Sequence, residues 1–273
     1  MYKIYFFCCK LLKKTNKKDN YRIKFLKFII GQIEAYYNLY IKKIWLKSKP
    51  PKLNSKKRKE RIIVSLTSYP KRIDIIWITI MSIFKQSMKP DEIILWLAEN
   101  QFNSIDSLPK ELKKLQKFGL RIKLCDDLKS HKKYFYALQE YKNDLVILID
   151  DDMFYPRDTI QKLYKMHKKY PNDICTMSAQ KMNSLLPSKW TNIKVDEKYE
   201  HSTEIQVFTG SGSLYPGNCL YKDAFDKELI KKLSPYADDL WITYMALKKG
   251  TRITCYHPWR SFPITIYGTA EGS

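Results

Sequence analysis

Beyond residue 60, short apolar runs alternate with segments in which apolar residues recur every three or four positions. The runs predict buried strands, and the three-to-four spacing predicts helices that bury one face. The predicted strands cover 62–66, 93–97, 120–124, 145–149 and 173–178. The predicted helices cover 75–86, 109–118, 134–141 and 160–167. Repeated strand–helix units predict an α/β domain with a mainly parallel sheet flanked by helices.

This alternation lapses in residues 181–207, which are polar and irregular. Residues 209–217 are rich in glycine and predict a loop. Two further helices and a last strand are predicted at 222–233, 237–250 and 251–256, with Gly250 as a helix-ending residue.

An amphipathic helix is predicted before this domain, at residues 21–47. Its apolar stripe follows three- and four-residue steps and consists of Ile23, Leu26, Ile30, Ile33, Tyr37, Ile41 and Ile44. Pro50, Pro51 and the basic run 55–59 predict a solvated linker. We therefore divide the chain into a basic amphipathic N-terminal extension with its linker, 1–60, and an α/β domain, 61–273.

The net charge of the chain is +22, and most of it belongs to the extension. Residues 1–60 contain 18 lysines and arginines against 3 acidic residues, a net charge of +15, which leaves +7 for the other 213 residues. Basic and aromatic side chains around an apolar helix face are typical of proteins that bind an anionic membrane surface. The alternatives are a helix that packs on the domain or on a second copy, and a nucleic-acid contact.

Apolar stretches and cysteines bear on the compartment. The longest apolar stretch near the start, 28–41, spans 14 residues and contains Glu34; a membrane-spanning helix needs about 20 residues. The six cysteines form no CxxC pair, and Cys125, Cys175 and Cys255 lie in apolar runs, as reduced buried thiols commonly do. Reduced thiols indicate a reducing compartment. We predict a cytoplasmic protein that lies peripherally at the inner face of a membrane.

Three consecutive carboxylates, Asp150, Asp151 and Asp152, end the apolar run 145–149. Like charges at one strand end repel one another unless a positive group lies among them. Carboxylate oxygens suit Mg²⁺ or Mn²⁺, and open α/β sheets bind ligands at the carboxyl ends of their strands. The triplet therefore predicts a divalent cation with a phosphorylated ligand; a solvated acidic turn before the next helix is the alternative.

Four features in a fixed order carry a resemblance to a known family. They are the Ser68-Tyr69-Pro70-Lys71-Arg72 turn after a strand, the acidic triplet, the Gly210–Gly217 loop and the Ala237-Asp238-Asp239 helix start. In this order the chain resembles nucleotide-sugar glycosyltransferases of the GT-A type, in particular bacterial enzymes that build capsule or lipopolysaccharide glycans. The resemblance covers roughly residues 61–257. It implies a Rossmann-like GT-A domain, bound Mn²⁺ or Mg²⁺, a nucleotide-diphosphate sugar donor, with a UDP-sugar expected, and a glycan or lipid-linked glycan acceptor.

By this resemblance, Asp150 and Asp152 form the Asp-x-Asp pair, with Asp152 in direct contact with the metal. Asp150 would hold the donor ribose or reach the metal through water, and Asp151 is an alternative member of the pair. His257 stands where some relatives have a further metal ligand.

The resemblance also implies which residues contact the nucleotide sugar. One of the neighbouring lysines Lys132 and Lys133, with Lys133 preferred, would neutralise the diphosphate, and Asp151 would belong to the same site as Asp150. Tyr215 and Trp241 would offer flat faces to a sugar. The residues that contact the nucleoside or bring backbone close to the donor sugar are Thr67, Ser68, Tyr69, Arg72, Gly210 and Gly212.

Asp238 and Asp239 stand where these enzymes have an acidic pair at a helix start. A carboxylate within hydrogen-bond reach of an acceptor hydroxyl can take its proton as a general base. Asp239 matches the position of the general base in these enzymes, and a base of this kind implies inversion at the anomeric carbon. An ordinary helix cap is the alternative for this pair.

Two other functions are weighed against this one. A nucleotidyltransferase of sugar-phosphate metabolism also uses carboxylates and a metal, but it favours a glycine-rich loop after the first strand, and residues 67–70 contain no glycine. A noncatalytic protein that binds membranes or nucleic acid would spread its charge over the folded body. Since the charge is concentrated in residues 1–60, we expect an enzyme with no nucleic-acid partner.

Overall fold

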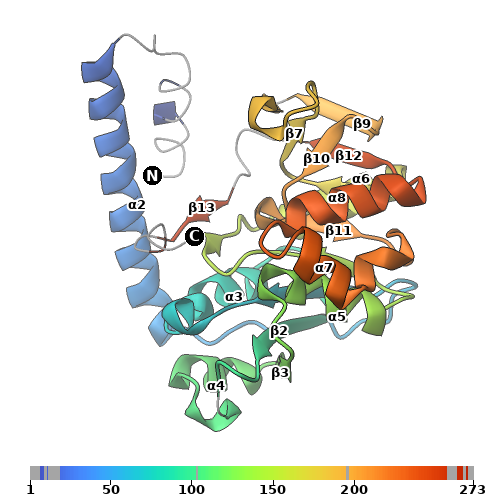
Figure 1. Cartoon of the computed structure of the whole chain (residues 1–273). Coiled ribbons are helices and arrows are strands. Elements are labelled where there is room, and N and C mark those ends of the chain that lie inside the picture. The colour runs from blue at the N-terminus through green and yellow to red at the C-terminus, as the bar shows by residue number, and fades with distance from the viewer. Residues whose placement is uncertain are drawn as a thin grey trace.

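The computed structural model describes residues 7–8, 11, 19–102, 104–194, 197–256, 263–266 and 269. Figure 1 shows one large body around a twisted sheet, with the long helix α2 (Asn20–Lys47) along one side. The prediction of an α/β fold with a mainly parallel central sheet and flanking helices is confirmed.

Eight strands form the central sheet. Their order is β3-β2-β1-β4-β11-β6-β12-β9. The neighbours β3/β2, β2/β1, β1/β4 and β6/β12 are parallel, whereas β11 is antiparallel to β4 and β6, and β9 to β12. The strands are β1 (Ile62–Thr67), β2 (Glu92–Ala98), β3 (Leu120–Cys125), β4 (Leu145–Leu148), β6 (Ile174–Thr176), β9 (Lys198–Ser202), β11 (Ser213–Tyr215) and β12 (Ile253–Tyr256).

Helices cover both faces of this sheet, as the alternation of side chains in β1 illustrates. Ile62, Val64 and Leu66 point into one core with α3, α4 and α6, while Ile63 belongs to a second core with α5, α7 and α8. Strands that bury both faces read as continuous apolar runs, which is why they are visible in the sequence. The helices are α3 (Ile76–Phe84), α4 (Lys110–Gln116), α5 (Lys132–Glu140), α6 (Thr159–Lys169), α7 (Lys227–Leu233) and α8 (Asp238–Lys249).

Three predictions of local structure are wrong after residue 180. The segment 181–207 is not irregular throughout, because it contributes to a small antiparallel sheet and to the edge strand β9. The loop predicted at 209–217 contains β11, which lies within the central sheet. The helix predicted at 222–233 is divided by Asp226, whose side chain caps α7. The small sheet contains β7 (Ala179–Lys181), β8 (Thr191–Asn192) and β10 (Ile205–Val207).

The helix α2 contacts the body at its C-terminal end. Ile41 and Trp45 are buried, and the Trp45 ring stacks on Phe154 at 4.9 Å between centroids. Phe154 lies in β5 (Met153–Phe154), which pairs with β13 (Ile264–Thr265). In the part of α2 that precedes Ile41, large apolar side chains are exposed, among them those of Tyr21, Phe25, Phe28, Tyr36, Leu39 and Tyr40.

The thiols and the helices bear on two further predictions. Cys125, Cys175 and Cys255 are free and buried, as predicted. Among the described helices, none has the length and apolar character needed to cross a bilayer.

Candidate active site

The candidate site lies where the chain reverses its path across the sheet. β1, β2 and β3 follow one another toward one edge, and the chain then returns to place β4 on the other side of β1. Open α/β sheets bind ligands at such a switch point. Because β1 and β4 are in parallel register up to Ser65 opposite Leu148, the turn after β1 and the acidic triplet after β4 extend from the same edge.

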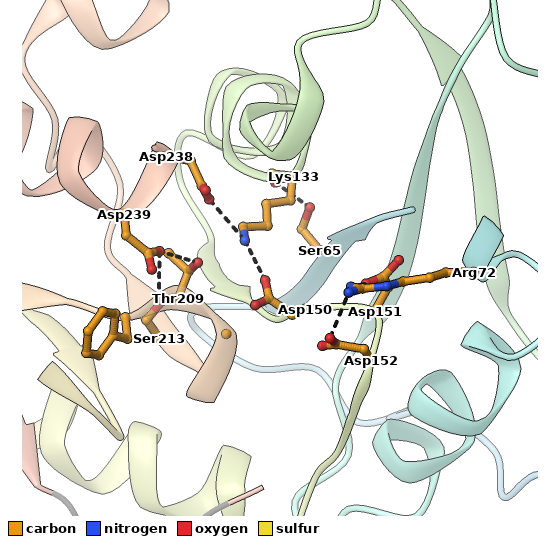
Figure 2. A network of polar contacts seen from close by, with 12 residues as sticks. Ser65, Arg72, Lys133, Asp150, Asp151, Asp152, Thr209, Ser213, Asp238 and Asp239 are labelled. Carbon is orange, nitrogen blue, oxygen red and sulfur yellow. Dashed lines mark hydrogen bonds and ion pairs between the residues drawn. The ribbon is translucent and has the colours of Figure 1, made fainter. Parts of the chain in front are cut away.

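Asp151 fixes the turn after β1 to the end of β4. Ser68 Oγ donates to Asp151 Oδ2 at 2.5 Å, and Arg72 Nη1 lies 2.7 Å from Asp151 Oδ1. The same Nη1 is 3.1 Å from Asp152 Oδ2 (Figure 2). Arg72 Nη2 donates to the carbonyl of Thr269 at 3.1 Å. One guanidinium therefore joins two members of the triplet to the C-terminal segment.

The three carboxylates differ in their access to solvent. The exposed fraction of the side chain is 36% for Asp150, 14% for Asp152 and 7% for Asp151. Burial raises the pKa of Asp152 to about 6, although Arg72 favours the ionised form. Asp150 and Asp152 are thus the members of the triplet whose carboxylates remain open to a ligand.

Asp150 also belongs to an ion network with two buried residues from the starts of two helices. Lys133 Nζ at the start of α5 lies 2.6 Å from Asp150 Oδ1 and 3.0 Å from Asp238 Oδ2 at the start of α8 (Figure 2). Although burial acts to raise the pKa of Asp238, the Lys133 ammonium holds that pKa below its ordinary value. The structure thus places Lys133 between two carboxylates.

Asp239 is held by a different partner. The backbone N and Oγ1 of Thr209 donate to Asp239 Oδ1 at 3.0 and 2.6 Å. No described residue donates a hydrogen bond to its other oxygen, Oδ2. Burial and the neighbouring charge of Asp238 raise the pKa of Asp239 to about 7. A carboxylate with a pKa in this range can accept a proton at neutral pH.

The glycine-rich segment packs directly against Asp150. Gly210 lies in the short helix η5 (Thr209–Ser211), and a Cβ at this position would be 2.1 Å from Asp150 Oδ2. The buried hydroxyl of Tyr155 accepts from the Asp150 N–H at 2.9 Å and donates to the Gly210 carbonyl at 2.6 Å. The sequence did not predict a role for Tyr155. Its position shortly after the acidic triplet was the only indication.

Three further residues that were predicted to contact the nucleotide sugar are Thr67, Tyr69 and Gly212. Thr67 Oγ1 donates to the carbonyl of Trp96 at 2.8 Å, and the Tyr69 ring lies under the Arg72 guanidinium, 5.4 Å from its centroid. Gly212 follows η5 with φ +96°, a backbone conformation that favours glycine.

The prediction that two aromatic rings stack on a sugar is wrong. Tyr215 and Trp241 are buried in the core that α5, α7 and α8 share, so neither ring faces a ligand. Tyr215 lies in β11, and its inward direction follows from the strand that the sequence did not reveal.

The oxygen atoms of the acidic triplet determine which metal ion this site suits. Asp150 and Asp152 supply carboxylate oxygens, which are the hard ligands that Mg²⁺ and Mn²⁺ prefer. Within the described ranges, no group of three or more histidine, cysteine or acidic side chains is arranged to hold a metal. His257 lies outside the described residues. Two carboxylates thus fit the ion, and no third ligand of these types is identified among the described residues.

Comparison with protein-family models assigns the chain to a family. Residues 64–230 match the model of "Glycosyl transferase family 2", which is more than half of the sequence. The chain belongs to glycosyl transferase family 2. The match includes Lys133, the acidic triplet and Gly210, while Asp238 and Asp239 lie beyond it. Family membership favours a glycosyltransferase over the nucleotidyltransferase and the noncatalytic binding protein.

Two solved structures resemble parts of the chain. The mannosyltransferase PcManGT from Pyrobaculum calidifontis, in complex with GDP-Man and Mn²⁺, has 15% identity and a TM-score of 0.44 over 83% of this chain and 63% of that protein. Residues 1–349 of TarS from S. aureus have 12% identity and a TM-score of 0.47 over 74% of this chain and 59% of that structure. The chain spans less than two thirds of each of them. No curated protein sequence matches it.

Proposed function

We propose that this family 2 protein is a metal-dependent glycosyltransferase that moves a sugar from a nucleotide-diphosphate donor to a glycan acceptor with inversion. The observation that carries the proposal is the joint placement of Asp150 and Asp239. Lys133 Nζ pairs with both Asp150 and Asp238 at the switch point of the sheet, and Asp239 is the residue after Asp238 at the start of α8.

Asp239 is the proposed general base. The acceptor hydroxyl oxygen attacks the anomeric carbon while the bond from that carbon to the diphosphate oxygen breaks. The hydroxyl proton passes to Asp239 Oδ2, since Thr209 already occupies Oδ1. Attack from the side opposite the leaving group inverts the configuration at that carbon.

Other residues of the site would bind and orient the donor. Asp150 and Asp152 would hold Mn²⁺ or Mg²⁺, which, when bound, offsets negative charge on the leaving diphosphate. A uridine nucleotide is the proposed donor, held on its base and ribose by Thr67, Ser68, Tyr69 and Arg72. Gly210 and Gly212 leave room for the donor sugar and the acceptor beside the carboxylates.

The first experiment is calorimetric titration of the protein with UDP and GDP, with and without Mn²⁺. We expect one nucleotide to bind in a metal-dependent manner and Asp152→Ala to lose that binding. Asp223→Ala is the matched control, because Asp223 pairs with Lys248 away from the site. If the folded protein binds neither nucleotide with Mn²⁺ present, the proposed function is wrong.

We further propose where the protein acts. The basic extension 1–60 would hold the domain 61–273 at the inner, cytoplasmic face of a membrane, near a lipid-linked acceptor of a bacterial capsule or lipopolysaccharide glycan. The charge of +15 in residues 1–60 and the exposed aromatic side chains of α2 support this placement.

A further inference from the structure

The ammonium group of Lys133 connects elements that lie far apart in the sequence. Lys133 lies in the first turn of α5, while Asp150 follows β4 and Asp238 begins α8. Its side chain is 4% exposed, and Nζ is within 2.6 Å of Asp150 Oδ1 and 3.0 Å of Asp238 Oδ2 (Figure 2). One buried cation therefore lies between the proposed metal-binding strand end and the helix that carries the proposed base.

The backbone of Lys133 is anchored independently of these ion pairs. Its carbonyl accepts a hydrogen bond from Ser65 Oγ at 2.5 Å, and the same Oγ accepts from Trp96 Nε1 at 3.0 Å. Ser65 lies in β1 and Trp96 in β2, so the start of α5 is attached to the most buried part of the sheet. This anchor fixes the point from which the side chain extends.

Removing the ammonium would leave the buried Asp238 carboxylate and the partly exposed Asp150 carboxylate without their shared counter-ion. Breaking a buried ion pair by removing one partner is strongly destabilising, because the remaining charge has no compensation. Asp238 and Asp150 would then separate or admit water. Since Asp239 is the next residue in α8, any shift of Asp238 moves the proposed base as well.

We propose that Lys133 is a positioning residue, which holds the start of α8 at a fixed distance from Asp150 so that the base and the donor-binding carboxylate keep their relative placement. The inference rests on the proposed function of this site. It differs from a direct contact between Lys133 and the donor diphosphate, which requires Nζ to leave a carboxylate for a phosphate oxygen.

The test compares Lys133→Met with Lys132→Met. Lys132 is the neighbouring buried lysine at the same helix start, and its Nζ pairs with Asp127 Oδ1 at 2.8 Å, outside the site. Binding of UDP, GDP, UMP and GMP is measured by calorimetry. Turnover is measured as nucleotide release from UDP-glucose, UDP-N-acetylglucosamine and GDP-mannose.

For Lys133→Met we expect kcat to fall about 100-fold, as for other small misplacements of reacting groups, with nucleotide affinity within about threefold of the wild type. Lys132→Met should retain the kcat of the wild type. If Lys133→Met instead loses affinity for the diphosphates and keeps it for the monophosphates, Lys133 binds phosphate and the inference is overturned. Unchanged turnover would overturn it equally.

A cycle of melting temperatures tests the pairing without any nucleotide. Lys133→Met should lower the melting temperature, and adding Asp238→Asn should recover part of the loss, because a neutral amide needs no counter-ion. The double variant should fold yet remain slow. Additive changes would show that the two groups do not interact and would refute the inference, whereas absence of nucleotide binding by the wild type refutes only the proposed function.

Discussion

Asp239 has one carboxylate oxygen engaged by Thr209 and a charge environment made of Asp238, Lys133 and Asp150. Burial and Asp238 raise its pKa to about 7, while Lys133 lowers it. A base must be ionised to accept a proton, so turnover should increase as pH rises through about 7 and level off above it. Donor turnover measured across this range checks the prediction, and a rate that is flat down to about pH 5 would contradict it.

The same pKa has an opposite consequence for stability. The folded state binds a proton on Asp239 more tightly than the unfolded chain does, so this group stabilises the fold less as pH rises from about 4 to about 7. Asp239→Asn removes that loss and keeps an oxygen for Thr209. We expect turnover to fall by a factor of about 10² to 10⁴ and the melting temperature above pH 7 to equal or exceed that of the wild type. Thermal denaturation and donor turnover test both; a variant that is both less stable and equally active would contradict the assigned role.

Gly210 offers a steric test of the site. A methyl group there would overlap Asp150 Oδ2, because the Cβ position is only 2.1 Å away. Gly210→Ala should displace the Asp150 carboxylate and reduce turnover by about 100-fold. Gly31→Ala is the control, since nothing lies within 4 Å of its Cβ position in α2 and the change favours helix. Equal turnover in both variants would mean that Asp150 does not need its present position.

At the scale of elements, what the sequence reveals depends on local pattern. β1, β2 and β4 are predictable because each is an apolar run buried on both faces. β11 is three residues long and lies within a glycine-rich stretch, so its place in the sheet depends on partners distant in the chain. The acidic triplet was predictable because it is a continuous run in the sequence. The contacts of Lys133 and Tyr155 with Asp150 were not, because they form only when the chain folds.

Trp45 makes an aromatic contact where α2 meets the body, beside the buried Ile41. Trp45 is buried, stacks on Phe154 and has Lys85 Nζ 5.5 Å from its ring centroid. Trp45→Ala should lower the free energy of unfolding by about 3 kcal/mol if the whole contact is lost. Amide hydrogen exchange in α2 should also accelerate. Denaturant unfolding measures the first effect; Ile44→Ala, at an exposed neighbour, should change stability by less than about 0.5 kcal/mol. Similar losses in both variants would mean that Trp45 is not the anchor.

Across the whole molecule, charge and chemistry are separated. The carboxylates of the site lie at the sheet edge, and +15 of the +22 net charge lies in residues 1–60. Helix α2 lies along one side of the body (Figure 1), and it buries Ile41 and Trp45 near its C-terminal end while several of its aromatic side chains are exposed. This arrangement allows the extension to bind a surface without disturbing the site.

We propose an anionic bilayer as that surface, because apolar side chains of the helix would enter the interface while its lysines would meet acidic headgroups. The full chain should therefore cosediment with vesicles that contain phosphatidylglycerol and much less with vesicles of phosphatidylcholine alone, and added salt should weaken the binding. Replacing Phe25 and Phe28 by serine should reduce binding at least about tenfold, since each loses apolar area that would leave water. Tyr236→Ser removes an even more exposed aromatic ring from the body and should leave binding unchanged. If the phenylalanine variant binds normally, or if neutral vesicles bind as well as anionic ones, the exposed face of α2 does not serve a membrane, and self-association measured by sedimentation velocity would identify a second copy as its partner.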